Sequence, residues 1–390
     1  MQKSVKTLDI KSEKGHNLDR QRNYGIDLLR IVSMLMIVTL HVLGQGGLLG
    51  VEGNEMKKTV LWFMEITSLC SVNCYALISG YVGYGRKIKA SSFIKLWFEV
   101  VFYLFVFSIG FKIFVPEYVG TFQLFSSFLP ISTNKYWYFT AYFALFLFMP
   151  FLNVLLDSLN KTEATILLIS LIFVFSVFPV ILLGKVWGGD LFYTNLGYSI
   201  LWLSVLYFIG AYLKKYPIRN NVKKCYCLFG ALACAIISFV CKCGFSFLSR
   251  YIKYTDKLSD LLTDYTSPTI LLCAVFLLLF FSRIKINQRL NKIIALVGPT
   301  TFGVYIIHLH PNIWMWLQER LVSYINLNVI LMVLVIIGTV LAIFAVCSMI
   351  DMIRIRLFRI CRINQLALKI EAMIRVCFNK VLKSVIDFSK

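Results

Sequence analysis

The sequence predicts an all-α, polytopic bundle of transmembrane helices, and three observations support that class. Of the 390 residues, 59% are hydrophobic and only 15% are charged, whereas soluble globular chains carry about 25% charged residues. The mean hydropathy is +0.76. Apolar runs of about 20 residues, the length that crosses a bilayer, recur along most of the chain. We therefore expect an integral membrane protein rather than a soluble one.

Ten apolar runs are long enough to span, although the seventh and eighth are short. Their approximate ranges are 25–46, 59–83, 93–115, 136–156, 164–183, 196–213, 225–241, 268–282, 293–316 and 329–350. The loops between them leave no room for a separate soluble domain. We expect three parts: a polar tail over 1–24, one transmembrane domain over 25–350 and a basic amphipathic tail over 351–390. The first run lacks a small-residue cleavage site and is too long for a signal peptide, so it is expected to stay as an anchor.

The distribution of Lys and Arg predicts the orientation. Of the 40 such residues, 29 lie in the two tails and in alternate loops, and 10 lie in the other loops. Because cytoplasmic loops carry the excess of positive charge, both termini are expected in the cytoplasm, with an even number of spans. The same distribution explains the net charge of +21, because the positive residues set the topology and attract anionic lipid. A nucleic acid partner is therefore not expected.

The tail after Asp351 alternates apolar and basic residues at helical spacing. This pattern is typical of an amphipathic helix on the inner leaflet, and binding to a protein partner is the alternative. The 11 cysteines are scattered and lack the spacing of a zinc site. No metal is therefore expected.

Arg30 and His41 are the most informative polar residues, because both lie inside the first apolar run. Eleven helical steps of about 100° come within roughly 20° of three full turns, so both side chains share one face, about 16 Å apart. Charged groups at membrane depth are costly and usually face a protein interior. We interpret this face as the core of an active site. The alternative is that Arg30 snorkels to the surface and His41 lies at the far end of the helix.

Glu65 and His308 are expected at depths comparable to that of His41, in the outer half of the membrane. An imidazole that takes a proton and a carboxylate that orients it are the parts of a general-base site. Glu65 could instead face an outer vestibule or pair with a lysine, and His308 could be an interfacial residue beside Pro311. His308 and His310, two positions apart, point to different helix faces, which argues against a metal pair.

On the expected cytoplasmic side, Asp27 lies one turn before Arg30 and is a natural partner for it. Arg86 and Lys87, after the second run, are candidates to clamp a phosphorylated ligand together with Arg30. Ordinary positive-inside charge explains Arg86 and Lys87 equally well. A ligand with a charged head and a long thin arm, such as an acyl-coenzyme A, would fit the line from Arg30 to His41.

Four stretches of the chain resemble the acyltransferase 3 family of bacterial membrane O-acyltransferases. They are RNYGIDLLRIVSMLMIVTLH, with Arg followed by ten residues and His, then SVNCYALISGYVGYGRK, KYWYFTAYFALFLFMPFLN and GPTTFGVYIIHLHP. They occur in order between residue 22 and residue 311, and the resemblance extends to about residue 350.

The resemblance implies ten core helices, an acyl-coenzyme A donor in the cytoplasm and an acceptor hydroxyl on a cell-surface or envelope polysaccharide. It also implies that His41 is the catalytic histidine and that Arg30 acts at the donor. Arg86 and Lys87 stand where many members have a basic pair. Glu65 matches no family motif, so its role rests on depth alone. The chain has neither the extra helix nor the hydrolase-like domain of some members.

The sequence thus favours a membrane acyltransferase, most simply an acetyltransferase of the bacterial plasma membrane that uses acetyl-coenzyme A or another acyl-coenzyme A. Direct transfer and an acyl-histidine intermediate both fit. Tyr305 and His308 are assigned to binding of the acceptor. Trp137 and Tyr138 are assigned to it as well, although both could instead belong to the aromatic belt at the membrane interface. A transporter or flippase for a glycan or small metabolite, with Arg30 and His41 as a proton relay, is the rival class. A non-catalytic scaffold is a third. The acceptor, the acyl length and the oligomeric state stay open.

Overall fold

The computed structural model describes residues 22–51, 54–187, 189–218, 223–253 and 255–388. These ranges contain helices, turns and loops but no β-strand, which confirms the all-α class. Eight helical runs within them are long and apolar enough to cross a membrane. They are α1 (Tyr24–Gly44), α2 with α3 (Glu55–Leu69, Ser71–Gly83), α4 (Ala90–Phe114), α6 (Trp137–Ser158), α7 with α8 (Lys161–Ile172, Phe178–Ile181), α11 (Lys224–Leu248), α14 with α15 (Gln288–Val297, Thr301–His308) and α17 (Val329–Ile360).

The two remaining expected spans correspond to shorter helices. The run 196–213 forms α10 (Ile200–Lys215, 16 residues), and 268–282 forms α13 (Pro268–Phe281, 14 residues). At 1.5 Å per residue they reach about 24 and 21 Å, less than the roughly 30 Å of the hydrocarbon core. The total of ten spans and the cytoplasmic location of both ends therefore stay predictions. The other helices are α5 (Thr121–Ser126), α9 (Gly184–Trp187), α12 (Thr255–Leu258), α16 (Pro311–Leu317) and α18 (Ile363–Phe388).

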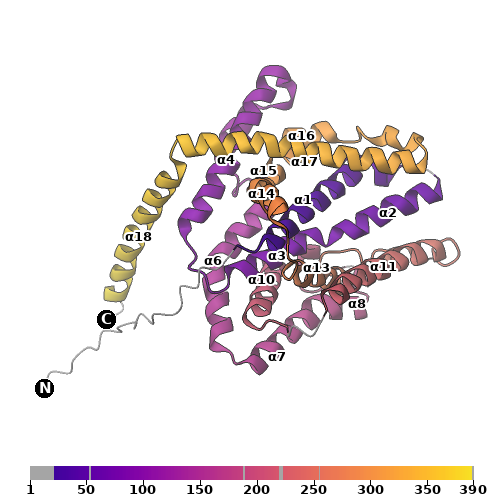
Figure 1. Cartoon of the computed structure of the whole chain (residues 1–390), viewed down its shortest axis with the longest axis horizontal. Helices are drawn as coiled ribbons and strands as arrows, with labels where there is room; N and C mark the ends of the chain where they lie inside the picture. Colours follow the sequence, from indigo (N-terminus) through magenta and orange to yellow (C-terminus); the bar gives the residue numbers. More distant parts are fainter. Residues whose placement is uncertain (1–21, 52–53, 188, 219–222, 254, 389–390) are drawn as a thin grey trace.

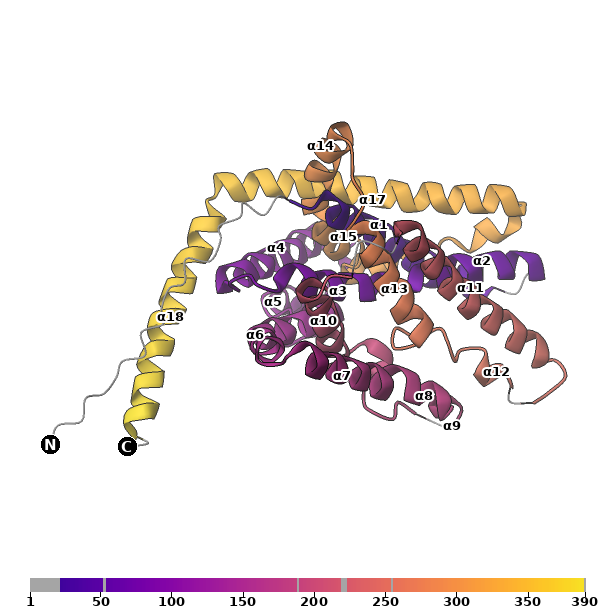
Figure 2. The same ribbon diagram turned by 60° about the horizontal axis from the view of Figure 1, so that its bottom comes forward.

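Helix α1 lies at the centre of the fold. It contacts α2, α3, α13, α14, α15 and α17, whereas α17 runs along one edge of the molecule and α18 turns away from it (Figures 1 and 2). Asn23 begins α1, since its side chain accepts a hydrogen bond from the backbone N–H of Ile26 at 3.2 Å. Leu29 and Val38 of α1 are fully buried. A helix surrounded in this way can present polar side chains to an interior cavity instead of to lipid.

Two glycines allow α3 and α10 to approach each other closely. A Cβ on Gly80 would clash with the carbonyl oxygen of Tyr207, and a Cβ on Gly210 would clash with that of Leu77. Small residues at a helix interface let backbones pack without intervening side chains, which is a common solution in membranes. This contact fixes α3 beside α10 and so holds one wall of the central bundle.

The expected ninth span, 293–316, is not a single helix. The helical run begins earlier, at Gln288, and ends at His308. Pro311 then starts α16 with His310 as its N-cap. Proline has no N–H to donate and prefers the first turn of a helix, so it separates α15 from α16 although the hydropathy is continuous. The break leaves His308 at the end of α15.

A buried ionic cluster joins α4, α15 and α17. Arg354 donates to both oxygens of Asp351, at 2.9 and 2.8 Å, and lies 3.0 Å from Glu99. The hydroxyl of Tyr103 donates to Asp351 at 2.7 Å, and Gly303 lies against the Asp351 carboxylate. Helix α17 continues to Ile360, ten residues beyond the end expected for the last span, and its first two charged residues, Asp351 and Arg354, are buried in the protein.

Candidate active site

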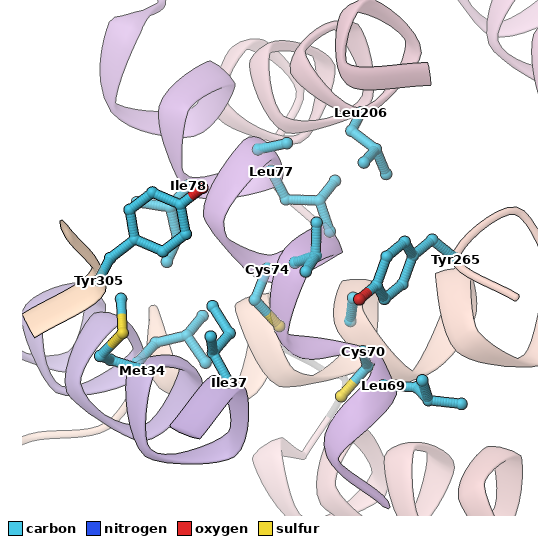
Figure 3. Packing of buried hydrophobic residues seen from close by; sticks show 14 of the residues in the cluster. Met34, Ile37, Leu69, Cys70, Cys74, Leu77, Ile78, Leu206, Tyr265 and Tyr305 are labelled. Atoms are coloured by element: carbon cyan, nitrogen blue, oxygen red, sulfur yellow. The ribbon is translucent and has the colours of Figure 1, made fainter. Parts of the chain in front are cut away.

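A cavity of about 710 Å³ runs beside α1. Its α1 lining begins at Met34 and ends at Gln45, a length of about 16 Å on a helix. Figure 3 shows the hydrophobic packing beside it, in which Met34 of α1 lies close to the ring of Tyr305 of α15, and both residues line the cavity. Aromatic rings dominate the lining, and the ionisable groups among the lining residues are His41, Glu65, Lys135 and tyrosine hydroxyls. A long, mostly apolar cavity with few polar groups is typical of a small-molecule site.

His41 lines this cavity, and His308 contacts it from behind without being a lining residue itself. The Nδ1 atom of His41 lies 2.9 Å from the Nε2 atom of His308. His41 also packs edge to face with Trp314, with ring centroids 5.1 Å apart. His308 is only 4% exposed, and its Nδ1 atom lies 2.5 Å from the carbonyl oxygen of Val304, one turn earlier in α15. The two imidazoles therefore form a chain that ends on a backbone carbonyl.

This chain determines the proton positions in the neutral pair. A carbonyl oxygen can only accept, so the Nδ1 of His308 must carry the hydrogen and donate it to Val304. The Nε2 of His308 is then an acceptor, and the Nδ1–H of His41 donates to it. The Nε2 of His41 is left with a free lone pair, and His41 lines the cavity. The tautomers are assigned from the hydrogen-bond network, and they leave one nitrogen available as a base or a nucleophile.

Glu65 lines the same cavity from α2. Its Oε2 atom is buried and has no hydrogen-bond partner among the described residues. The structure thus brings Glu65 to the site, as its expected depth suggested. The contact that orients His41 is made by His308 and not by a carboxylate.

Arg30 lies one turn before Met34, where the α1 lining of the cavity begins, and is not itself a lining residue. Its Nη1 atom is 2.5 Å from one oxygen of Asp27, and Arg22 contacts the other oxygen of Asp27 at 2.5 Å. The hydroxyl of Tyr75, a lining residue, donates to the backbone carbonyl of Arg30 at 2.9 Å. The Arg30 side chain is 30% exposed. The expected pairing with Asp27 is present, and the Arg30 side chain is not fully buried by it.

Arg86 and Lys87 lie in the turn after α3 and are exposed. Neither lines the cavity. The structure therefore places them at the end of a helix that packs against α1, without bringing them into contact with Arg30.

The aromatic candidates Trp137, Tyr138 and Tyr305 all line the cavity. The rings of Tyr138 and Tyr305 meet edge to face at a centroid distance of 6.1 Å. The hydroxyl of Tyr305 is buried without a hydrogen-bond partner among the described residues.

Sequence reasoning did not identify several lining residues. Gln45 lies one turn after His41 and donates to the carbonyl of Trp314 at 2.9 Å, which ties α1 to α16. Lys135 is a half-buried cation on the lining, and burial lowers the pKa of its ammonium group from the ordinary value. Gln45 was recognisable from its position, four residues from His41 on the same face. Lys135 carries no comparable local signal.

His310 has a different environment from His308. It is fully buried, stacks on Phe111 at a centroid distance of 6.3 Å, and its Nδ1 accepts a hydrogen bond from the backbone N–H of Asn312 at 3.3 Å. It does not line the cavity. The two histidines thus diverge, as their spacing predicted.

The fold and the site define a multi-pass membrane protein with a histidine-centred interior cavity. A family model described as an acyltransferase domain matches residues 23–349, which is most of the chain, and the chain therefore belongs to the acyltransferase 3 family. This match confirms the resemblance seen in the sequence and fits a membrane acyltransferase. No curated protein and no solved structure matches the chain.

Proposed function

We propose that this protein is an acyl-coenzyme A-dependent O-acyltransferase that moves an acyl group, most simply acetyl, to a hydroxyl of a cell-surface or envelope polysaccharide. The observation that carries the proposal is the His41–His308 pair at a cavity that begins one turn from Arg30. Membership of the acyltransferase family supports the reaction class. The proposed location is the bacterial plasma membrane, with ten spans and both ends in the cytoplasm.

The donor is proposed to enter from the Arg30 side. The guanidinium of Arg30 is held by Asp27 and remains partly exposed, so it can bind a phosphate of coenzyme A. Arg86 and Lys87 add positive charge on the same side of the proposed topology. The thin arm of the donor then follows the cavity from Met34 to His41, seven residues or about 10 Å along α1.

In the direct reaction, Nε2 of His41 takes the proton of the acceptor hydroxyl while the oxygen attacks the thioester carbonyl carbon. The tetrahedral intermediate collapses, the carbon–sulfur bond breaks, and the imidazolium returns the proton to the departing thiolate. The products are an oxygen ester and coenzyme A with a free thiol. His308 accepts the Nδ1–H of His41 throughout, which keeps Nε2 pointed at the substrate and stabilises the transient positive charge.

The same nitrogen also serves a two-step reaction. Nε2 of His41 would attack the thioester carbon, expel the thiolate and form an acyl-imidazole, which the acceptor hydroxyl would then attack. Glu65, on the cavity wall, is a candidate to accept the hydroxyl proton in that second step. Rapid quenching followed by mass analysis of the peptide that contains His41 distinguishes the two routes.

The acceptor is proposed to approach from the opposite end of the cavity. Trp137, Tyr138 and Tyr305 lie along the cavity lining and offer flat apolar surfaces with polar edges, which suit a sugar ring that has entered as far as His41. The aromatic lining is continuous with the His41 end, where Trp314 contacts the imidazole. A carbohydrate hydroxyl held on these rings would face Nε2 of His41.

The experiment uses the full chain in proteoliposomes with labelled acetyl-coenzyme A inside and an envelope glycan fraction outside. The expected result is release of free coenzyme A together with base-labile acetyl ester on the glycan. His41→Ala is expected to abolish both products. His310→Ala is the matched control, because it removes a buried histidine of the same helical region that does not line the cavity.

The proposal would be overturned if intact protein moved the glycan or another metabolite across the membrane without forming an ester. It would also be overturned if His41→Ala retained ester formation in cells that express the variant at the normal level. Comparison of envelope glycans from cells with and without the protein, by mass and ester content, identifies the acceptor.

A further inference from the structure

Helix α18 follows α17 but does not continue its direction. Helix α17 has 32 residues and a length of about 48 Å, well over the roughly 30 Å of the hydrocarbon core. Its end at Ile360 therefore lies outside the core if the rest of the helix spans it. Both views show α18 crosswise to α17 and leading away from the bundle (Figures 1 and 2). A helix crosswise to a span at its end lies along the membrane surface.

The first turns of α18 are docked on the beginning of α4. Ala367 is fully buried, and Ile363 and Ile370, on the same face, are partly covered. One carboxylate oxygen of Glu371 accepts a hydrogen bond from the backbone N–H of Ser91 at 3.3 Å. These contacts fix the rotation of α18 about its own axis. The face that carries Ile363, Ala367 and Ile370 is therefore directed toward the span α4.

The same apolar face continues beyond the docked part, with no described residue covering it. Ile374, Phe378 and Val381 follow Ile370 at steps of four, four and three residues, and they are 50%, 64% and 61% exposed. Met373, on the edge of the face, is 68% exposed. Because the docked part fixes the rotation of the helix, the exposed continuation of this face also points toward the membrane core.

Cations flank the apolar face on both sides. At 100° per residue, Lys369 and Lys380 project along one flank and Arg375 along the other. All three are exposed, and Arg362 precedes them at the turn from α17. Glu371 is the one acidic residue of α18 whose side chain the structure describes, and it faces Ser91 and Arg375. The positive charge on these flanks therefore suits the negatively charged phosphate groups of lipids.

From this arrangement we propose that α18 is a membrane-surface helix that binds anionic phospholipid. Its apolar face enters the boundary of the acyl chains beside α4, and Lys369, Arg375 and Lys380 contact lipid phosphates. An amphipathic helix with basic flanks binds an interface by the sum of apolar burial and attraction to anionic lipid. This inference does not depend on the proposed acyl transfer.

The experiment places one nitroxide probe on native Cys377, which lies on the apolar face, in full-length protein with Cys225, Cys241, Cys243 and Cys361 replaced by serine. The reconstituted membranes contain phosphatidylcholine with or without phosphatidylglycerol. Accessibility to oxygen, which dissolves in lipid, is compared with accessibility to a water-soluble nickel chelate. With phosphatidylglycerol, the probe on Cys377 is expected to be reached by oxygen and shielded from nickel.

Two variants control the result. A probe on Asn379→Cys, on the polar face and with Cys377 also replaced by serine, is expected to remain accessible to nickel. Replacing Lys369, Arg375 and Lys380 with glutamine is expected to weaken attachment by roughly a hundredfold, since each basic residue near an anionic surface contributes about fivefold. The probe on Cys377 then becomes accessible to nickel. Glutamine at Lys285, Arg289 and Lys292, exposed cations at the start of the α14 region, removes the same charge and is expected to leave the probe shielded.

Two outcomes would overturn the inference. A Cys377 probe reached by nickel equally in both membranes would show that α18 stays in water. A probe shielded from both oxygen and nickel would show that protein, such as a partner or a second copy, covers the face. Neither outcome bears on ester formation, so failure here is distinguishable from failure of the proposed function.

Discussion

Gly303 of α15 lies directly against the carboxylate of Asp351 of α17, in a position where any Cβ would overlap the carboxylate. The contact lies five residues before His308 on the same helical segment. It places α15 relative to α17, and thereby sets the position of the imidazole that holds His41.

Gly303→Ala is therefore expected to destabilise the protein by about 1–3 kcal/mol, the usual cost of overpacking a core, and to lower acyl transfer. Thermal unfolding in detergent and the ester assay measure the two effects. Gly338→Ala in α17 is the matched control, because no atom lies within 4 Å of its added Cβ. Equal unfolding temperatures for the two variants would contradict the packing role of Gly303.

His308→Ala is expected to lower acyl transfer by roughly 10²–10⁴-fold, the range typical of general acid–base partners. The cause is loss of the acceptor that fixes the tautomer of His41. Added imidazole is expected to restore part of the activity, because it can occupy the vacated volume and accept the same hydrogen. The activity of His310→Ala, whose imidazole lies outside the cavity, should not respond to imidazole. A His308→Ala enzyme with wild-type activity would refute the dyad.

Because Tyr305 lines the cavity and its buried hydroxyl has no hydrogen-bond partner among the described residues, we propose that this hydroxyl also donates to the developing oxyanion, and Tyr305→Phe is expected to reduce the turnover number by about 10²–10³-fold. Thermal stability should not change, because the hydroxyl has no partner among the described residues. Tyr136→Phe offers the contrast, since the Tyr136 hydroxyl donates to the carbonyl of Ile306 at 2.9 Å. That variant is expected to lose about 1 kcal/mol of stability. Unchanged turnover in Tyr305→Phe would assign the hydroxyl no part in the reaction.

Arg30→Ala is expected to abolish the rise in unfolding temperature that coenzyme A gives the wild-type protein. The reason is loss of the phosphate contact, which stabilises the folded state by mass action. Arg86→Ala and Lys87→Ala, more exposed and away from the cavity, are expected to reduce the rise only partly. If coenzyme A raised the unfolding temperature of Arg30→Ala as much as that of the wild-type protein, the donor phosphates would bind somewhere other than Arg30.

Acidification is expected to release α18 from α4. Hydrogen bonding to Ser91, aided by Arg375, lowers the pKa of Glu371 below its ordinary value. The contact is thus complete above the unfolded pKa of about 4.3 and is lost as the pH falls through the lowered pKa. Pulsed EPR between probes on Cys377 and Ser92→Cys in neutral detergent measures the separation. It is expected to be constant from neutral pH to about 5 and to widen below about 4.

Glu371→Gln provides the control for this pH dependence. The amide cannot ionise, so the separation in that variant is expected to show no step with pH. A step of the same size in Glu371→Gln would assign the transition to another group.

Local patterns predicted much of the architecture and pointed to both His41 and His308, but not to the contact between them. Hydropathy located the long helices because each span must be apolar over its own length. The shared face of Arg30 and His41 followed from helical periodicity within one segment. Both inferences concern residues that are close in sequence, where helix geometry alone sets the relative positions.

Contacts between distant segments could not be derived in the same way. His308 lies 267 residues from His41, and only the packing of α15 on α1 brings them together. Pro311 interrupts a run that hydropathy reads as continuous. From the sequence, Asp351 appeared to begin a surface tail. Hydropathy averaged over a window does not reveal that Arg354, three residues later, pairs with Asp351 inside the fold.

His41 is hydrogen-bonded to a second imidazole, and no carboxylate among the described residues is hydrogen-bonded to it, which has an electrical consequence for the proposed reaction. A histidine–aspartate pair would hold a permanent negative charge at bilayer depth, where an ion costs several kcal/mol. Two neutral imidazoles hold none between turnovers. Positive charge arises on the dyad only when a hydroxyl loses its proton, at the moment when negative charge arises on the attacked carbonyl, and both vanish when the products separate. The ion pair between the imidazolium and the oxyanion would then exist only during each turnover, and the two histidines would carry no charge between turnovers.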